Sequence, residues 1–345
     1  MLENGENMNL YGLTRQELEQ YFARIGEKKF KATQVFEWLY QHRVNSMEEF
    51  SNIKKEIREQ LQKDFSLELP KVIKREVDTD VEKYLFELED QERIEAVLMR
   101  HNYGLSVCVS SEVGCNMGCK FCESGRLKKV RNLETHEMVG QILVIESLIK
   151  ERISSVVIMG IGEPLDNYDN VIGFIKIIND AKGIAIGARH ITLSTCGIIP
   201  KIKDLSDLEI QINLAISLHA PNDTLRNKLI PINKAYPLKE LIKTIKDYIK
   251  KTNRRVTIEY ILLKDVNDKK EHAKELANLL RGMNIYVNLI PYNETNHIEF
   301  KKSDKQTIDD FYETLQQEKI QVTVRREFGS SISAACGQLR SKEVK

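Results

Sequence analysis

Three closely spaced cysteines are the strongest indication of chemistry in this sequence. Cys115, Cys119 and Cys122 form a CxxxCxxC pattern within the segment GCNMGCKFC. Three thiolates at this spacing on a loop can each bind one iron of a cubic 4Fe-4S cluster. Because the segment holds no fourth cysteine, the fourth iron would stay open to a small molecule. The pattern therefore predicts a cluster whose open iron takes part in a reaction.

A structural zinc site is the alternative interpretation of these cysteines. Such zinc sites normally have four protein ligands, and no nearby pair of Cys or His completes one here. His136 lies fourteen residues beyond Cys122, and we interpret it as a histidine on a helix surface. The remaining cysteines are Cys108, Cys196 and Cys336. Four of the six cysteines lie within fifteen residues, which favours metal or redox chemistry over a disulfide framework.

The cysteine segment directly follows the first of several apolar strands that alternate with helices. Near-continuous apolar runs such as SSVVIMG are typical of buried parallel strands. The alternation predicts an α/β fold built on a parallel (βα)6 barrel that is only partial, with an open six-stranded sheet as the alternative. We expect strands at 104–110, 154–160, 190–195, 211–218, 255–262 and 285–291. We expect helices near 135–150, 170–181, 199–206, 238–251, 269–281 and 303–317, followed by a strand in QVTVRR.

Two further regions precede the predicted barrel. Thr14 and Ser46 each begin an S/T-x-x-E capping box next to an amphipathic run, and FKATQVFEWLYQHR has an apolar face around the only tryptophan, Trp38. Extended runs follow in KVIKREV, EKYLFELE and RIEAVLMR, with a hairpin-like break at DQE. We therefore expect a helical domain at 1–70, a strand-rich linker at 71–102, a core at 103–330 and a C-terminal segment at 331–345.

The composition of the 345-residue chain excludes several classes of protein. Hydrophobic residues make up 41% and charged residues 30%, which excludes a disordered, collagen-like or coiled-coil chain. Lys and Arg number 52 against 51 Asp and Glu, so a nucleic-acid partner must be argued from local patches. No apolar run approaches the roughly 18 residues of a membrane span, and MLENGENMNL does not resemble a signal peptide. We expect a cytoplasmic protein without membrane contact.

Motifs along the chain resemble those of one enzyme family. CxxxCxxC with Phe121 before its last cysteine resembles the signature of the radical S-adenosylmethionine (SAM) superfamily, whose open iron binds the amino and carboxylate groups of SAM. MGIGEPLDNYDNV, HITLSTCGIIP, LAISLHAPND, LIPYN and AACGQL follow in order. Over residues 28 to 340 the chain resembles the RlmN/Cfr family, radical SAM methyltransferases that methylate an adenine of large-subunit ribosomal RNA. The resemblance implies one 4Fe-4S cluster and SAM as cofactors.

The resemblance also implies which residues contact SAM. All of them follow predicted barrel strands, at the end where such barrels build their sites. Glu163 can pair with the SAM amino group, because a carboxylate beside an apolar strand is costly to bury without a cation. For His219 a purely structural hydrogen bond is an equal alternative, and we interpret Cys196 as structural. The implied contacts are Gly162, Glu163, Ser194, Ser217, Leu218, His219 and Asn293.

Two cysteines and one glutamate have implied roles in methyl transfer. In this family the cysteine that matches Cys336 is methylated by one SAM, and a second SAM yields the radical that activates this methyl group. The target carbon of adenine is electrophilic, so a carbon radical can add where a polar methyl transfer cannot. Cys108 matches the cysteine that then forms a transient disulfide with Cys336. Glu95 matches a proton acceptor. From the residues alone, Cys108 would be a small buried hydrophobe and Glu95 a surface group.

The expected partners follow from the same resemblance. We expect an unpaired or flipped adenine of 23S ribosomal RNA, methylated at carbon 2, with tRNA as a candidate second substrate. We also expect an electron donor such as flavodoxin or ferredoxin, and a monomer. LAISLHAPND and GEPLDNYDNV are closer to the carbon-2 enzymes than to the carbon-8 enzymes of antibiotic resistance. The alternatives are carbon-8 methylation, a radical SAM enzyme with a non-RNA substrate, and a non-enzymatic module that carries a cluster.

Two segments depart from the family pattern. ESGRLKKVRNL follows Cys122 where the family usually has a small residue and then TG, and GSSISAAC replaces a segment with aspartates. Glu123 is the most unusual residue of the first segment. Basic side chains near these segments either contact RNA or are solvated loop charges, with equal weight. They are Lys128, Lys129, Arg131, Arg325 and Arg326.

Overall fold

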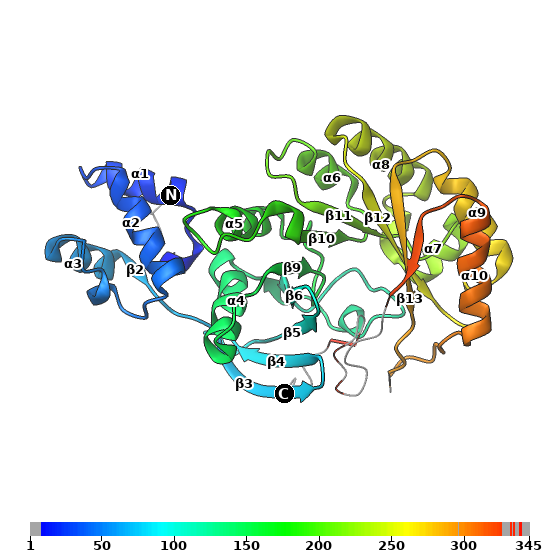
Figure 1. The fold of residues 1–345 in the computed structure, drawn as a ribbon, viewed down its shortest axis with the longest axis horizontal. Helices are drawn as coiled ribbons and strands as arrows, with labels where there is room; N and C mark the ends of the chain where they lie inside the picture. Colours follow the sequence, from blue (N-terminus) through cyan, green and yellow to red (C-terminus); the bar gives the residue numbers. More distant parts are fainter. Residues whose placement is uncertain (1–7, 296, 326–331, 333, 335–337, 340–345) are drawn as a thin grey trace.

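One ten-stranded sheet runs through the protein (Figure 1). The computed structural model describes residues 8–295, 297–325, 332, 334, 338 and 339. Within these residues the strand order is β14-β13-β12-β11-β10-β9-β6-β5-β4-β3. Neighbouring strands from β6 to β14 are parallel, and those from β3 to β6 are antiparallel. In the described part of the chain β14 and β3 remain at opposite edges, so the parallel strands form a partial barrel without closure.

The parallel strands and their helices lie close to the predicted positions. Each is within two residues of its expected bounds, and the strands of the expected linker extend the same sheet because β5 pairs with β6. The antiparallel strands are β3 (Lys71–Asp78), β4 (Val81–Glu87) and β5 (Arg93–His101). The parallel strands are β6 (Gly104–Val109), β9 (Ser155–Ile158), β10 (Ile191–Thr195), β11 (Asn213–Ser217), β12 (Val256–Leu262), β13 (Ile285–Pro291) and β14 (Val322–Val324).

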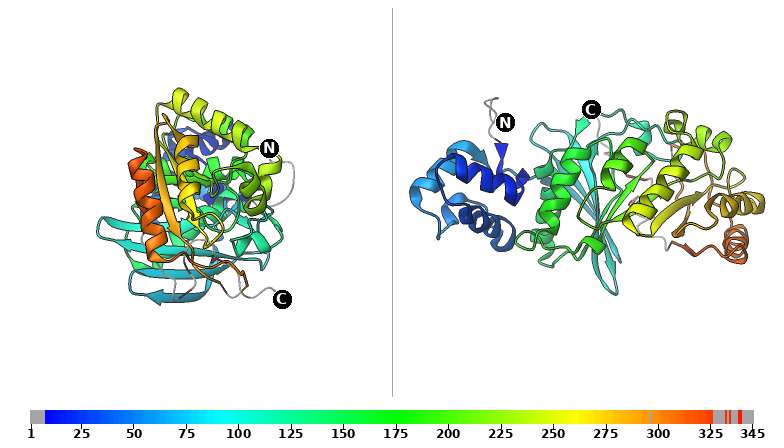
Figure 2. Two further views of the ribbon diagram at one scale, coloured as in Figure 1. Left: turned by 90° about the vertical axis from the view of Figure 1, so that its right-hand side faces the viewer. Right: turned by 90° about the horizontal axis from the view of Figure 1, so that it is seen from above.

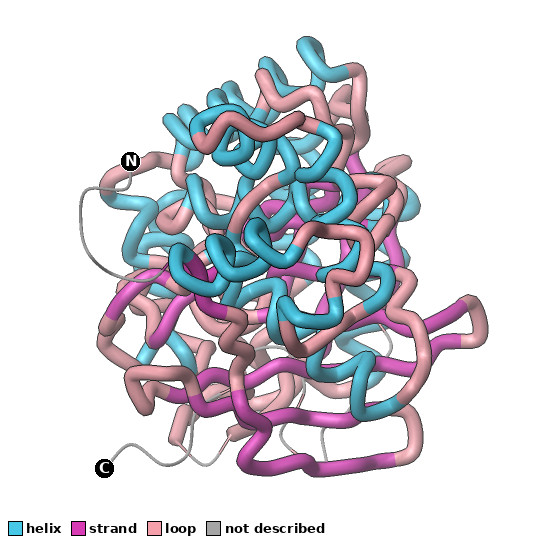
Figure 3. The backbone as a smooth tube through the Cα atoms, turned by 90° about the vertical axis from the view of Figure 1, so that its left-hand side faces the viewer, coloured by secondary structure: helices cyan, strands magenta, loops and turns pink. Residues whose placement is uncertain are grey.

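Helices cover the outer face of the parallel strands. On β12, Ile258 and Tyr260 point into the main apolar core beneath the helices, whereas Glu259 and Ile261 lie on the inner face. In Figure 3 the antiparallel strands form the lower edge, and most helices lie above them. The helices are α4 (Thr135–Ile149), α5 (Tyr168–Asn179), α6 (Ile199–Leu205), α7 (Asp223–Leu229), α8 (Leu238–Thr252), α9 (Lys270–Leu280) and α10 (Lys305–Gln317). The short helix α7 had not been expected.

A helical domain precedes the sheet, as predicted. The Thr14 capping box begins α1, whereas the Ser46 box begins a short 3-10 turn that precedes α3. The segment FKATQVFEWLYQHR forms α2 followed by a π-helical turn, which ends where Arg43 adopts a φ of 55°. The elements are β1 (Met8–Asn9), α1 (Arg15–Arg24), α2 (Phe30–Glu37), the π-helical turn (Trp38–His42), α3 (Lys55–Asp64) and β2 (Phe65–Ser66).

This domain packs against helices α4 and α5 at one end of the molecule (Figure 2). Arg43 lies 2.6 Å from the carboxylate of Glu146 on α4, which is fully buried. Arg15 pairs with Asp180 at 2.9 Å just beyond α5. Since the domain also shares the main apolar core, its position relative to the sheet is fixed by packing. Among the described residues, no helix is long and apolar enough to cross a membrane.

Candidate active site

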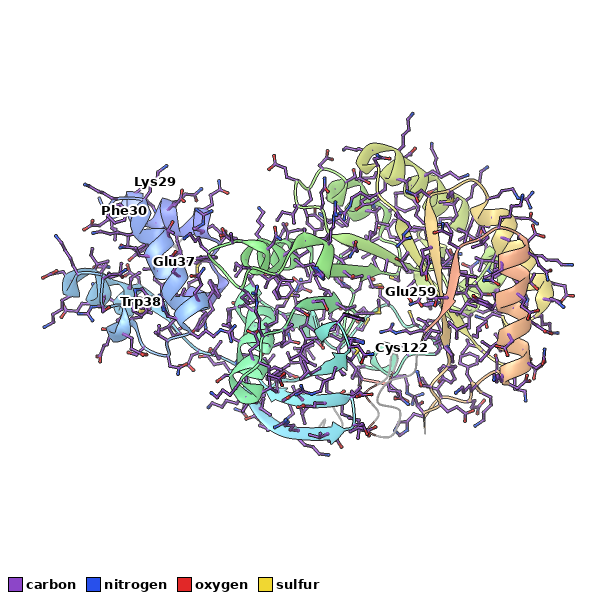
Figure 4. All side chains as sticks on the ribbon, in the orientation of Figure 1. Lys29, Phe30, Glu37, Trp38, Cys122 and Glu259 are labelled. Atoms are coloured by element: carbon purple, nitrogen blue, oxygen red, sulfur yellow. The ribbon has the colours of Figure 1, made fainter. Side chains whose placement is uncertain are left out.

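One cavity gathers most of the predicted site residues. It lies at the C-terminal ends of the parallel strands, and Cys122 and Glu259 are labelled beside it in Figure 4. The C-terminal ends of parallel strands meet at one edge of such a fold, which brings together residues far apart in sequence. The predicted residues that line the cavity are Cys115, Cys119, Cys122, Gly162, Glu163, Ser194, Ser217 and His219.

The cysteine loop is held in place by backbone hydrogen bonds. Two short strands, β7 (Glu112–Val113) and β8 (Arg131–Asn132), close the loop at its base. The Cys115 amide donates to the Leu127 carbonyl at 3.2 Å, and the Cys122 amide donates to the Cys119 carbonyl at 3.3 Å. Gly114 has a φ of 74°, and a Cβ there would lie 2.2 Å from the Lys128 carbonyl oxygen, so only glycine fits. This backbone brings all three cysteines to the cavity.

The donor set of this loop fits an iron-sulfur cluster better than zinc. Across the described residues, no three Cys, His, Asp or Glu side chains converge on a point that could hold a single metal ion. A structural zinc needs such convergence, whereas cysteines that hold a cubic cluster each bind a different iron. Burial raises the pKa of the Cys115 thiol to about 12 and also raises the pKa of Cys119. These thiols therefore need a nearby metal cation to become thiolates.

Glu163 joins the loops that follow β9 and β10. Its carboxylate accepts hydrogen bonds from the Leu165 amide at 3.0 Å and the Cys196 amide at 2.8 Å. Burial raises its pKa. The preceding Gly162 has a φ of 113°, and a Cβ there would lie 2.7 Å from the Cβ and Cγ of Glu112. Glycine is therefore required for the close approach that brings Glu163 to the cavity wall.

Ser194 and Ser217 differ from His219 in how far their side chains are available to bind a ligand. The hydroxyl oxygens of Ser194 and Ser217 lie 3.4 Å apart on the cavity wall. His219 accepts a hydrogen bond at Nδ1 from the Ile261 amide at 3.0 Å, and burial lowers its pKa to about 3. The geometry therefore supports a structural hydrogen bond for a neutral His219 that also lines the cavity. Leu218 is fully buried in the main core, and neither it nor Asn293 lines the cavity.

Cys108 and Glu95 lie on the inner face of the sheet, on the neighbouring strands β6 and β5, since Cys108 pairs with Val157, which shares its face with the cavity-lining Met159. Cys108 pairs in register with Val97 of β5, two residues beyond Glu95, so the two side chains share a face. Glu95 is 3% exposed and lies 3.7 Å from the ammonium of Lys83 on β4. The interpretation of Glu95 as a surface group is therefore wrong. The transient disulfide of Cys108 remains a prediction.

Described residues of the C-terminal segment lie near Cys108. Ala334 and Leu339 belong to the same small apolar cluster as Val97, with Cys108 against it. The Ser124 hydroxyl, just beyond the cysteine loop, donates to the Leu339 carbonyl at 2.8 Å. The predicted methyl carrier Cys336 lies outside the described residues. Described residues on both sides of it thus lie against the Cys108 face and next to the cysteine loop.

The unusual basic residues after Cys122 have partners inside the protein. The Lys129 ammonium lies 2.6 Å from both Glu112 and Asp166. Glu112 in turn accepts a hydrogen bond from the Glu163 amide at 3.0 Å. Arg131 pairs with Glu137 at 2.7 Å. The interpretation of Lys129 and Arg131 as solvated loop charges is therefore wrong, whereas RNA contact remains a prediction; through Glu112, Lys129 supports the loop that carries Glu163.

The other residues singled out in the two unusual segments differ in their exposure and in their contacts. Glu123 is 3% exposed, whereas Lys128 is on the surface. The guanidinium of Arg325 lies 3.7 Å from the sulfur of Met159, which lines the cavity. Arg326 lies outside the described residues.

Two comparisons with known families match most of the chain. Residues 8–67 match the ribosomal RNA large subunit methyltransferase N-terminal domain, and residues 109–280 match the radical SAM superfamily. A protein named probable dual-specificity RNA methyltransferase RlmN from Enterococcus faecalis is 53% identical, over 98% of this chain and 97% of its own. A protein of the same name from Spiroplasma citri is 52% identical, over 97% of each chain. The chain belongs to the RlmN family.

A solved structure agrees with this membership. The crystal structure of a radical SAM methyltransferase from Sphaerobacter thermophilus has a TM-score of 0.91 and 40% identity, covering 97% of this chain and 100% of that one. Members of the radical SAM superfamily use SAM and a 4Fe-4S cluster, so the RlmN-family protein described here is a SAM-dependent methyltransferase. The predicted partial barrel with an N-terminal helical region is confirmed.

Arg226 on α7 is a site-shaping residue of this RlmN-family chain that the sequence did not indicate. It is fully buried, and its guanidinium donates to the carbonyls of Cys196 at 2.6 Å, Leu218 at 3.2 Å and Ser217 at 3.3 Å. It also donates to the Asn233 side chain at 2.7 Å. One side chain thereby ties together the ends of β10 and β11. The helix α7 that carries it is short and lacks a strong apolar period, which is why it was missed.

We expect Arg226→Met to destabilise the protein strongly. The substitution leaves several buried oxygens without a donor, and since each unsatisfied buried acceptor costs about 1 to 3 kcal/mol, the free energy of unfolding should fall by about 3 kcal/mol or more. Urea unfolding followed by circular dichroism measures the loss. Arg226→Lys keeps the charge and some donors, so it should lose less. A loss below about 1 kcal/mol for Arg226→Met, the range of ordinary substitutions, would contradict this role.

Proposed function

We propose that the protein methylates an adenine of 23S ribosomal RNA and of tRNA at carbon 2, with Cys336 as the methyl carrier. Membership of the RlmN family carries the broader statement that it is a SAM-dependent RNA methyltransferase. The observation that supports the finer proposal is the arrangement of two adjoining sites. The cavity joins the three cysteines to Glu163, and residues flanking Cys336 pack beside Cys108 and the cysteine loop.

The residues of the cavity have separate tasks in this proposal. Cys115, Cys119 and Cys122 would hold the cluster, which when bound supplies the electron that cleaves SAM. Glu163, fixed by two backbone amides, would accept a hydrogen bond from the SAM amino group. Ser194 and Ser217 offer hydroxyls to SAM from the neighbouring strands β10 and β11. Apolar Phe121 and Ile261 help to keep water from these groups.

The face that carries Cys108 would serve the later steps. Glu95 would accept the proton that leaves the target carbon, and the ammonium of Lys83 lies 3.7 Å from its carboxylate. The Cys108 thiol would then displace Cys336 from the product and form a disulfide with it, and an electron donor such as flavodoxin or ferredoxin would reduce this bond. Two SAM molecules are consumed in each turnover, one for Cys336 and one for its activation.

The N-terminal domain offers a surface suited to RNA. Phe30 is 55% exposed and follows the exposed Lys28 and Lys29 in sequence (Figure 4). An exposed aromatic ring beside lysines can stack on an unpaired base while the ammonium groups contact phosphate. Because the domain is packed against α4 and α5, RNA held there would have a fixed orientation to the cavity. We propose that the protein acts as a monomer on RNA in the cytoplasm.

Labelling of RNA nucleosides tests the proposed function. The cluster is reconstituted without oxygen, and the protein receives reductant, methyl-labelled SAM and unmodified 23S ribosomal RNA and tRNA transcripts. We expect mass spectrometry of the digested nucleosides to find labelled 2-methyladenosine. Label in 8-methyladenosine would contradict the choice of carbon. Cleavage of SAM with no labelled nucleoside would contradict the RNA substrate.

A further inference from the structure

A second hollow in the protein surface lies where β10, β11 and β12 begin, whereas the cavity with the cysteines lies where these strands end. Its volume is about 670 Å³. Strands of five to seven residues rise about 3.3 Å per residue, so the two sites are roughly 15 to 25 Å apart. We call this hollow the arginine pocket; its lining is wholly polar or charged and consists of Arg189, Thr192, Gln211, Asn213, Thr252, Asn253, Arg254, Arg255 and Thr257.

The positive charge of the arginine pocket has no counterion among the described residues. No aspartate or glutamate lines the pocket, and none of its three arginines forms an ion pair within the described part of the chain. Arg254 is half-buried, and burial lowers its pKa, as does the positive charge of Arg189. The two guanidinium groups are therefore close enough to repel each other. Holding two cations together in a partly buried place is costly, and a bound anion would remove that cost.

Two of the arginines are held in place by contacts that leave donors unused. The Nη1 atom of Arg254 donates to the Ile212 carbonyl just before β11. The guanidinium of Arg255 lies over the ring of Tyr286 on β13, 4.8 Å from its centre. A guanidinium has five N–H donors, so donors remain on both side chains for a ligand. Their planar, forked arrangement matches the oxygens of a phosphate group.

The surroundings favour the phosphates of RNA among the possible anions. Asparagine, glutamine and threonine side chains beside arginines are groups that contact phosphate and sugar in nucleic-acid complexes. The segment 180–190, which carries Arg189, also contacts the N-terminal domain, where Lys182 pairs with Glu37 of α2 at 2.6 Å. One segment therefore connects the arginine pocket to the domain whose exposed Phe30 and lysines suit RNA.

An acidic electron-donor protein fits the position of the arginine pocket less well. Such a protein must deliver its electron to the cysteine loop, which lies at the opposite ends of the strands. The phosphates of a folded RNA have no such restriction, because the RNA can reach the pocket and the cavity with different nucleotides.

We propose that the arginine pocket binds phosphate groups of the RNA substrate, remote from the nucleotide that is methylated. The inference deepens the proposed function and rests on it only for RNA as the substrate. Because the pocket is separate from the cavity, it contributes affinity and orientation for the RNA and takes no part in the chemical steps.

Removal of two exposed charges tests this contact without catalysis. Fluorescence anisotropy measures the binding of a labelled, unmodified tRNA transcript to the cluster-loaded, full-length protein at several salt concentrations. Arg189→Gln combined with Arg255→Gln removes two charges at exposed positions, so the variant should fold. Exposed charge pairs change affinity by up to about 5-fold each, so the double variant should bind about 2- to 30-fold more weakly. The slope of log affinity against log salt should become less steep by about 2, one for each lost phosphate contact.

Arg281→Gln is the matched control. Arg281 lies just before β13 at the same end of the sheet, but it already pairs with Glu318 at 3.1 Å. This variant should keep the affinity and the salt slope of the wild-type protein. Equal weakening by Arg281→Gln and by a single Arg189→Gln would overturn the proposal, because any surface charge would then have the same effect. Unchanged affinity and slope in the double variant would also overturn it.

Further arms identify other ligands. Isothermal titration with inorganic phosphate and with ATP detects a small phosphate ligand, and the rate of cluster reduction by flavodoxin detects a docked electron donor. Loss of ATP binding, or slower reduction, in a double variant that binds RNA normally would overturn the proposal in favour of that ligand.

Failure of this proposal can be distinguished from failure of the proposed function. The anisotropy titrations contain no SAM and require no methylation. RNA binding that depends on the arginines, without any labelled 2-methyladenosine, would contradict the proposed function and leave the arginine pocket standing. Labelled 2-methyladenosine formed by a protein whose RNA affinity is independent of these arginines would have the opposite meaning.

Discussion

Cys119→Ser is expected to lose the cluster and all SAM cleavage. The cavity brings three thiols to one wall, and replacing one of them leaves two ligands for a cluster that needs three from the protein. Loss of a mere outer-shell partner costs about 10- to 100-fold in metal affinity or activity, so loss of a ligand should cost more. Iron content and the absorption of the reconstituted protein measure the cluster, and 5′-deoxyadenosine formed under reduction measures the cleavage.

Cys196→Ser is the matched control for this prediction. Cys196 lines the same cavity and is also buried, but it lies at the end of β10 rather than in the cysteine loop. A serine keeps the shape of the side chain, and the amide that donates to Glu163 belongs to the backbone. The variant should therefore keep its iron and its SAM cleavage. Loss of iron in Cys196→Ser, or an intact cluster in Cys119→Ser, would mean that the ligand set is different.

The sequence predicted the parallel part of the fold well, because the pattern of apolar residues there matches the burial of the strands. Runs such as SSVVIMG are almost wholly apolar, and Val156 and Ile158 of β9 are buried in the core, so the strand could be located from its own residues. The bounds of β13 are those predicted, and those of β6 and α4 differ by one residue. The antiparallel hairpins were likewise indicated by the break between β4 and β5. Whether the sheet closes into a barrel could not be predicted from the sequence, because closure depends on how far the sheet curves.

The predicted helix boundaries were inaccurate where contacts with distant residues override local sequence preferences. Both capping boxes form, but the Ser46 box is followed by only a 3-10 turn before α3 begins at Lys55. The helix that starts at Phe30 widens into a π-helical turn at Trp38. At its end Arg43 turns to reach the buried Glu146 on α4, a partner more than a hundred positions away. No local propensity encodes such a partner.

The sequence predicted most of the residues that line the cavity, but not the residues that hold those side chains in position. Spacing located the cysteine loop, and the family resemblance indicated Glu163, Ser194 and Ser217, all of which line the cavity. Charge patterns were less informative, since a lysine or glutamate in sequence does not reveal its partner. From the sequence, Lys129 was expected to contact RNA or solvent, and Glu95 alone would have been placed on the surface. Both side chains instead pair with opposite charges inside the fold. Arg226, which binds three carbonyls at the strand ends, had no sequence signal.

Cys108→Ala is expected to stop the reaction after the methyl group has joined the RNA. Cys108 lies on the inner face of β6, against the cluster that includes Ala334 and Leu339. Without its thiol nothing would displace Cys336 from the product, so protein and RNA should remain linked through a methylene group. Release of 2-methyladenosine should fall below detection. Denaturing gels should show a protein band shifted by covalently bound RNA, which nuclease treatment returns toward its original position.

Cys336→Ala provides the opposite block and the sharpest control. With no methyl carrier the linked species should be absent, while SAM cleavage to 5′-deoxyadenosine continues because the cavity residues are unchanged. A double variant of Cys108 and Cys336 should behave like Cys336→Ala alone, since the carrier acts before the resolving thiol. Free 2-methyladenosine from Cys108→Ala would show that another group resolves the product. Linked RNA in Cys336→Ala would mean that a different side chain carries the methyl group.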